Sequence, residues 1–340
     1  GGLALVNVIS NSLFGSISGS SVAATSAIGS FMVPEMEKQG YPRSFSAALT
    51  ASASITGLLI PPSNILIIYA VASGGVSISA LFVAGYIPGI AVMIGLMIVS
   101  FFYARKSKDI LLNPAMEKGT LLQKTWDAFP SLFLIFLIIG GILAGIYTAT
   151  EAGAIAVAYA FVLSTFVYKE LSLEDLPSVL VKGVKTTAMV MFLIGTSMAM
   201  SWVLAYENVP TSVAETLLSI TDNPILLLLI INITLLIVGA FLDITPAVLI
   251  FTPIFLPVAV SLGMSPLQFG IMLVLNLSIG LCTPPVGSVL FVACAVARTK
   301  ITDLIKPLLP MYGAMIAALL LVTYVAGVSE FLPRLFGLIE

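Results

Sequence analysis

The sequence lacks histidine altogether and has only two cysteines among its 340 residues. The absence of histidine excludes haem ligation by histidine, a His-ligated zinc site and a Ser-His catalytic pair. The cysteines, Cys282 and Cys294, lie in one apolar segment, so neither a disulfide framework nor a thiolate metal cage is expected. The net charge is −2 and there is no run of Lys or Arg, which argues against nucleic-acid binding.

Charged residues are also scarce. They make up 9% of the chain, whereas 59% of the residues are hydrophobic and the mean hydropathy is +1.14. This composition lies far outside the range of soluble domains and predicts an all-α polytopic membrane protein in a lipid bilayer. The first residues are apolar, with neither Met nor a basic region ahead of them, and do not resemble a signal peptide. We therefore expect a natural start upstream and further N-terminal helices.

A proline-containing element occurs twice. The element GLLIPPSN at residues 57–64 returns as GLCTPPVG at residues 280–287, 223 residues later. The same offset pairs Gly40 with Gly263 and Pro34 with Pro257. These matches indicate an internal repeat. In each copy the Pro-Pro pair removes two amide donors within an apolar run and breaks the helix. Lipid offers no water to satisfy the freed backbone groups, so such a break is expected only where it lines a cavity or a binding site.

Each copy begins with two short apolar arms joined by a polar tip. No arm reaches the ~20 residues of a full span, so we predict two re-entrant hairpins. Their arms and tips are 1–14, 15–21 and 22–37 in the first copy, and 225–238, 239–246 and 247–260 in the second. The other predicted elements are discontinuous helices at 44–73 and 266–297, spans at about 80–104, 129–148, 151–168, 183–205 and 307–328, and a polar connection at 105–128.

These elements predict four regions of the chain. Residues 1–78 and 222–300 each hold a hairpin with its broken helix, and together they form the expected transport domain. Residues 79–221 hold scaffold helices and a cytoplasmic connection, and residues 301–340 hold a last scaffold helix with a tail.

The predicted order of crossings inverts the second copy. One discontinuous helix and four spans separate the hairpins, and this odd number turns the second hairpin towards the opposite side. Lys and Arg should gather on the cytoplasmic side, which gives an independent test. The predicted topology leaves only Arg334 outside and places thirteen basic residues inside: Lys38, Arg43, Arg105, Lys106, Lys108, Lys118, Lys124, Lys169, Lys182, Lys185, Arg298, Lys300 and Lys306.

Inverted repeats with discontinuous helices are typical of secondary transporters, where half-helix ends face the ligands. Hydroxyl, amide and freed carbonyl oxygens suit a small hard cation such as sodium, so we predict two sodium sites and no other cofactor. Site one comprises Ser16, Ser18, Gly19, Ser20, Ser21, Thr56, Gly57, Pro61, Pro62, Ser63 and Asn64. Site two comprises Gly239, Asp243, Thr245, Asn276, Ser278, Gly280, Thr283, Pro284, Pro285 and Gly287.

No Lys or Arg lies within a predicted span near the tips, so an anionic substrate is expected to bind helix N-termini, backbone amides and hydroxyls. The bound sodium ions would offset its charge. The residues predicted to contact it are Ser18, Ser20, Asn64, Asp243 and Thr245.

Simpler structural interpretations remain open for these residues. Gly15, Gly19 and the tip serines are also suited to close helix packing in lipid. Asp243 is costly at membrane depth, which favours a function, but it can equally serve as the N-cap of the second arm. Glu151, after Thr148, is expected to cap a span, and Trp126, Trp202 and the tyrosines to anchor the chain at the interface.

Three segments resemble a known family. The tip GSISGSSVAATSAIG (residues 15–29), the stretch IPPSNILIIYAVASGGVSISALFVAGYIPG (residues 60–89) and NLSIGLCTPPVGSVLFVA (residues 276–293) are similar to the large membrane subunit of tripartite ATP-independent periplasmic (TRAP) transporters. The resemblance covers nearly the whole chain and implies a multi-pass protein of the bacterial inner membrane. It implies sodium-driven import of an organic acid, such as sialic acid or a C4-dicarboxylate. The family's usual subunit is longer at the N-terminus.

The resemblance also implies partners and a mechanism. The substrate would arrive on a periplasmic binding protein, and a small membrane subunit would brace the large one. The hairpins and broken helices would move as an elevator against a scaffold, in a fold of the ion-transporter superfamily type. The sodium-binding roles would fall on the tip serines with residues 57–64, and on Asp243 and Thr245 with residues 280–287.

Other functions compete with this interpretation. A sodium/dicarboxylate carrier of similar hairpin architecture would need no binding protein. An intramembrane serine protease would need a histidine, and the aspartyl type a second intramembrane Asp beside Asp243. A scaffold or channel subunit would show no sodium-dependent accumulation.

Overall fold

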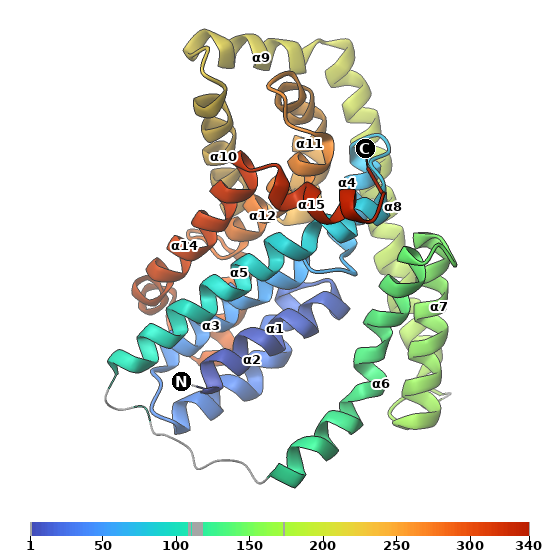
Figure 1. The fold of residues 1–340 in the computed structure, drawn as a ribbon, viewed down its shortest axis with the longest axis vertical. Helices are drawn as coiled ribbons and strands as arrows, with labels where there is room; N and C mark the ends of the chain where they lie inside the picture. Colours follow the sequence, from blue (N-terminus) through green and yellow to red (C-terminus); the bar gives the residue numbers. More distant parts are fainter. Residues whose placement is uncertain (1, 108–109, 111–117, 173, 340) are drawn as a thin grey trace. The chain divides into compact units, whose positions relative to one another are not determined.

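The computed structural model describes residues 2–107, 110, 118–172 and 174–339, and these form helices joined by short turns. They fall into two compact units. Unit 1 comprises residues 1–112 and 197–340, and unit 2 comprises residues 113–196. Unit 1 contains both hairpins and both broken helices, so it holds all the predicted site residues (Figure 1).

The first half of unit 1 consists of a helical hairpin, a broken helix and one long helix. The hairpin is α1 (Gly2–Ser18) and α2 (Ser21–Lys38). The broken helix is α3 (Arg43–Ser54), a 3-10 turn η1 (Ile55–Leu58) and α4 (Asn64–Ala72), and α5 (Ile78–Lys106) follows. Ser20 is the N-cap of α2, and Gly19 next to it has a φ of +63°, which glycine adopts without strain.

The second half of unit 1 repeats this series of elements. Its hairpin is α10 (Pro224–Phe241) and α11 (Ile244–Ser261), its broken helix is α12 (Pro266–Leu281) and α13 (Ser288–Ala297), and α14 (Ile301–Tyr324) follows. The helices α11, α12 and α14 begin 223 residues after α2, α3 and α5. The two Pro-Pro bonds, Pro61–Pro62 and Pro284–Pro285, are both cis. The structure therefore confirms the repeat that the proline elements predict.

Unit 2 contains α6 (Lys118–Leu143), α7 (Ala149–Val162), a π-helical turn η2 (Leu163–Val167) and the first part of α8 (Leu176–Tyr206). The predicted role of Glu151 as a cap is confirmed. Its backbone N–H donates to Thr148 Oγ1 at 3.3 Å, and its carboxylate accepts from the Thr148 backbone N–H at 2.7 Å.

Several predicted boundaries need correction. The polar connection predicted at 105–128 is shorter than predicted, because α5 ends at Lys106 and α6 begins at Lys118. Charged residues of this stretch therefore belong to the ends of these helices rather than to a loop. Lys108 lies outside the described residues. Two short helices were not predicted, α9 (Val209–Ile220) and α15 (Gly327–Leu335), because neither has the long apolar run of a span.

Six described helices are long and apolar enough to cross a membrane, by length and composition: α5, α7 with η2, α8, α10, α11 and α14. The arms α10 and α11 have 18 residues each and are longer than predicted. Their re-entrant course stays a prediction.

Helices of each half of unit 1 pack against helices of the other half. Each hairpin packs against the first part of its own broken helix, α1 and α2 on α3, and α10 and α11 on α12. The second part of each broken helix packs against the other hairpin, α4 on α11 and α13 on α2. The long helices α5 and α14 contact each other and the broken helices (Figure 1).

Candidate functional site

Glycines bring the first hairpin against the first helix break. A Cβ on Gly57 would overlap the backbone of Gly15, and a Cβ on Gly15 would lie 2.9 Å from Gly57 Cα. One turn away, the buried hydroxyls of Ser12 and Thr56 share a hydrogen bond of 2.6 Å. The tip of the hairpin is thereby held beside the break.

Asn64 lies against Gly19 at the tip of the hairpin. A Cβ on Gly19 would lie 3.1 Å from Asn64 Cγ and 3.2 Å from its Oδ1, so the side-chain amide of Asn64 rests against the tip. Ser18 and Asn64 are exposed and Ser20 is half-buried. Ser20 Oγ accepts from Ala23 N–H at 3.2 Å, which keeps its second lone pair available.

The other predicted residues of site one have internal partners. Ser16 Oγ donates to Leu13 O at 2.8 Å, and Thr56 Oγ1 donates to Ala53 O at 2.6 Å. Ser63 Oγ donates to Leu58 O, one of the carbonyls freed by the break, at 2.5 Å. Ser21 and Pro61 are buried and Pro62 is half-buried. These residues therefore shape the backbone, while Ser18, Ser20 and Asn64 are the accessible polar groups.

The second hairpin meets its break in the same way. A Cβ on Gly239 would lie 3.2 Å from Gly280 Cα, and a Cβ on Gly280 would overlap Gly239. Gly287, with a φ of +40°, donates its N–H to Ala240 O at 3.3 Å and so ties the far side of the break to the hairpin.

The tip of the second hairpin presents a carboxylate. Asp243 is the N-cap of α11, as predicted, but its side chain caps no backbone N–H. The carboxylate is exposed and forms no hydrogen bond or ion pair with any described residue. Thr245 and Thr283 are half-buried, and Pro285 is exposed beside half-buried Pro284. Asp243 is thus free to bind a cation.

Two predicted residues of site two take part in helix packing. Ser278 is buried and donates to Val274 O at 2.6 Å. Asn276 is buried and donates its Nδ2 to Asn232 Oδ1 at 2.7 Å, and Asn232 Nδ2 donates to Thr323 Oγ1 at 3.1 Å.

A similar chain of hydrogen bonds, at positions that the repeat does not match, exists in the first half. Asn11 Nδ2 donates to Asn7 Oδ1 at 2.6 Å, and Asn7 Nδ2 donates to Thr50 Oγ1 at 2.9 Å. Asn7, Asn11 and Asn232 were not among the predicted residues, although a buried amide in an apolar helix is costly enough to be a signal.

The donor set at the two tips fits a small hard cation. Hydroxyls, an amide oxygen and a carboxylate are oxygen ligands, and the break adds free carbonyls. In a continuous helix, Leu281 O would accept from the N–H of residue 285, but that residue is Pro285 and has no N–H. Leu281 O accepts no hydrogen bond from the described residues.

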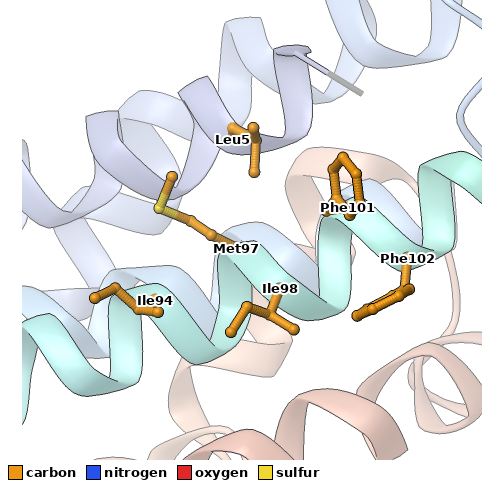
Figure 2. A pocket seen from close by; sticks show the side chains of 6 residues that line it. All are labelled: Leu5, Ile94, Met97, Ile98, Phe101 and Phe102. Atoms are coloured by element: carbon orange, nitrogen blue, oxygen red, sulfur yellow. The ribbon is translucent and has the colours of Figure 1, made fainter.

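An apolar groove lies elsewhere in unit 1, between α1 and α5. Its volume is about 280 Å³ and its lining is Leu5 of α1 with Ile94, Met97, Ile98, Phe101 and Phe102 of α5 (Figure 2). No polar side chain lines it, so it offers nothing to bind an organic acid or an ion.

Known proteins resemble this chain along almost its whole length. A family described as "Tripartite ATP-independent periplasmic transporter, DctM component" matches residues 1–328. A Salmonella typhimurium protein called YgiK is 48% identical over 340 residues, which cover 99% of this chain and 77% of YgiK. The C4-dicarboxylate TRAP transporter large permease protein DctM of Rhodobacter capsulatus is 40% identical over 355 residues, 99% of this chain and 80% of DctM. The sialic acid TRAP transporter large permease protein SiaM of Vibrio cholerae is 38% identical over 336 residues, 99% of this chain and 78% of SiaM.

Proposed function

This chain belongs to the DctM family, the large permease component of tripartite ATP-independent periplasmic (TRAP) transporters, and we propose that it imports an organic acid in symport with sodium ions. It is a transporter subunit of the bacterial inner membrane rather than an enzyme. The family implies a small membrane subunit and a periplasmic binding protein as partners. The proposed substrate is a carboxylate of the C4-dicarboxylate or sialic acid type, since relatives are permeases for these.

The observation that supports sodium coupling is the repeated contact between a hairpin tip and a helix break. In both halves a glycine of the first arm touches a glycine at the break, Gly15 with Gly57 and Gly239 with Gly280. Each tip then carries polar oxygens in a region where freed carbonyls are available. We assign one sodium ion to Ser18, Ser20 and Asn64 with the first break, and a second to Asp243 and Thr245 with the second break.

Helix N-termini at the tips suit an anionic substrate. The second arms α2 and α11 begin directly after their N-cap residues Ser20 and Asp243, so their N-terminal amides point towards the tips. Backbone amides and the Ser18, Ser20 and Asn64 side chains would bind the carboxylate, while sodium at Asp243 and Thr245 would offset its charge.

An elevator movement agrees with the packing inside unit 1. The helices α5 and α14 contact each other and the broken helices, so we propose that they move with the hairpins. This grouping would transfer α5 and α14 from the predicted scaffold regions to the moving part, and it leaves the helices of unit 2 as scaffold candidates.

The test is sodium-driven uptake in proteoliposomes that contain the full complex. We expect Asp243→Asn, and separately the pair Ser18→Ala with Ser20→Ala, to raise the sodium concentration for half-maximal uptake by about tenfold, which corresponds to roughly 1.4 kcal/mol. Ser30→Ala is the matched control. Ser30 lies on α2, outside the tip, and its hydroxyl donates to Ala27 O in a hydrogen bond of 2.7 Å. Normal sodium dependence in both site variants would contradict the assignment.

The alternative is a carrier that works without a binding protein. Omitting the binding protein from the outer solution distinguishes the two, because uptake by the membrane subunits alone would favour this alternative.

A further inference from the structure

The two helix breaks hold equivalent carbonyl groups in different ways. With the repeat offset of 223 residues, Leu59 corresponds to Cys282, Gly85 to Leu308 and Gly89 to Tyr312. Leu59 and Cys282 are the residues directly before the Ile-Pro-Pro and Thr-Pro-Pro segments. Each carbonyl has lost its normal helical donor, and an unpaired carbonyl at membrane depth is costly.

In the first half, α5 approaches the break through glycines. A Cβ on Gly85 would overlap Leu59 O, and a Cβ on Gly89 would lie 2.5 Å from Ile60 Cγ1. Leu59 O accepts no hydrogen bond from the described residues, whereas Leu58 O accepts from Ser63 Oγ at 2.5 Å. The first break is thus stabilised by its own serine and by direct contact with the α5 backbone.

In the second half, α14 provides a hydrogen bond instead. The phenol of Tyr312 donates to Cys282 O, and Thr283 lies beside the same phenol. The residue that corresponds to Ser63 is Val286, which has no hydroxyl and is 42% exposed. The second break has a bond of its own, from Thr283 Oγ1 to Ile279 O at 2.9 Å, but the Cys282 carbonyl is held by a side chain from another helix.

We propose that Tyr312 is a positioning residue for the second ion site: it fixes the Cys282 carbonyl, and thereby directs the free Leu281 carbonyl and the lone pairs of the Thr283 hydroxyl, which itself donates to Ile279 O at 2.9 Å, towards the ligand. This inference rests on the proposed function. Without the phenol, the Cys282–Thr283 peptide keeps its N–H bond to Gly280 O at 2.8 Å, but its carbonyl loses its partner, so the oxygens of the second site lose one of the bonds that fix their geometry. The first site has no such dependence, so the two sites respond differently to a change in α14.

The experiment uses the complete transporter in proteoliposomes and compares Tyr312→Phe with Tyr69→Phe. Tyr69 is a matched control, because its hydroxyl donates to Pro266 O at 2.6 Å, a carbonyl at the opposite end of the same helix α12. Each variant removes one phenol-to-carbonyl bond at an end of α12, to Pro266 or to the C-cap residue Cys282, and keeps the ring. We expect Tyr312→Phe to raise the sodium half-saturation about three- to tenfold, the effect of one lost hydrogen bond, with the maximal rate preserved. Tyr69→Phe should keep the parent's sodium half-saturation.

Melting temperatures of both variants in detergent complete the test. Equal sodium dependence in Tyr312→Phe and the parent overturns the inference, and so does a Tyr312→Phe protein that melts well below Tyr69→Phe, since the role would then be structural. If the parent itself takes up substrate without sodium, the proposed function fails, and that result is visible before any variant is compared.

Discussion

At the scale of single residues, the tip of the first hairpin has two kinds of residue. Gly15 and Ser16 face the broken helix, where Gly15 touches Gly57 and Ser16 bonds to its own helix. Ser18 is exposed, and Gly19 lies against the Asn64 amide. The packing interpretation of the small residues is therefore confirmed for Gly15, while a binding role stays a prediction for Ser18 and Ser20.

Close backbone contact makes the paired glycines sensitive to a single methyl group. A Cβ on Gly280 would overlap Gly239, so Gly280→Ala must push α10 away from α12. We expect a loss of about 1–3 kcal/mol in stability, as for overpacked cores, measured as a lower melting temperature in detergent. Gly313→Ala on α14 is the control, since a Cβ there meets no atom within 4 Å. Equal melting temperatures for the two variants would contradict the close contact.

At the scale of helices, buried asparagines join each hairpin to its neighbours. In both halves an Asn amide bonds to a second Asn, which bonds to a Thr, whose hydroxyl bonds to a backbone carbonyl of its own helix. The Oδ1 atoms of Asn11 and Asn276 are buried without a partner in the described residues. Directional bonds of this kind fix the rotation of one helix relative to its neighbour. Apolar contacts alone do not specify this rotation, because they are not directional.

Asn276 and Asn232 are expected to be coupled. Asn276→Leu leaves Asn232 Oδ1 buried without a donor and should cost about 1–3 kcal/mol, whereas Asn232→Leu with Asn276→Leu together should cost less than the sum of the single changes. A double-mutant cycle on thermal or denaturant unfolding measures this difference. Strictly additive effects would mean that the two side chains do not interact.

At the scale of the whole molecule, the two repeats are interlocked within unit 1. The α13 helix of the second repeat packs on α2 of the first, and α4 of the first packs on α11 of the second. Neither broken helix can move far without the other hairpin. This exchange is the physical reason to expect unit 1 to move as one body.

A disulfide between the repeats tests that expectation. A Cβ on Gly29 of α2 would lie 4.0 Å from Val296 Cβ of α13, within the usual disulfide range of about 3.5–4.5 Å. In a background without Cys282 and Cys294, Gly29→Cys with Val296→Cys should cross-link on oxidation and keep sodium-driven uptake close to the reduced level. Gly74→Cys with Val296→Cys is the control, since a Cβ on Gly74 meets nothing within 4 Å. Loss of uptake on oxidation, restored by reduction, would show that α2 and α13 must separate during transport.

Much of the fold was predictable from the sequence. The discontinuous helices predicted at 44–73 and 266–297 are observed from Arg43 to Ala72 and from Pro266 to Ala297. Proline and glycine act on their own backbone, so their effect is present in the sequence before any packing. The short helices α9 and α15 were missed, because short helices depend on tertiary contacts for their stability.

The candidate site was only partly predictable, as particular residues show. The sequence identified the tips and the breaks, but it did not distinguish Ser16 from Ser18 as a binding residue, nor Asn276 from Thr283. Ser16 and Asn276 are buried and bond within the helix packing, whereas Ser18 is exposed, and Thr283 is half-buried at the break although its hydroxyl donates to Ile279 O. Tyr312 was predicted, with the other tyrosines, to anchor the chain at the interface, because its partner Cys282 is thirty residues away in the chain and gives no local signal.

The sequence by itself determined that this protein lies in a membrane, that it consists of two related halves and that each half contains a helix break. These properties follow from hydropathy and from the backbone chemistry of proline, which are local. Only the tertiary structure decided which oxygens remain available at each tip and that α14 supports the second break through Tyr312. Hydrogen bonding and close packing depend on which helices become neighbours, and that arrangement arises only when the whole chain is folded.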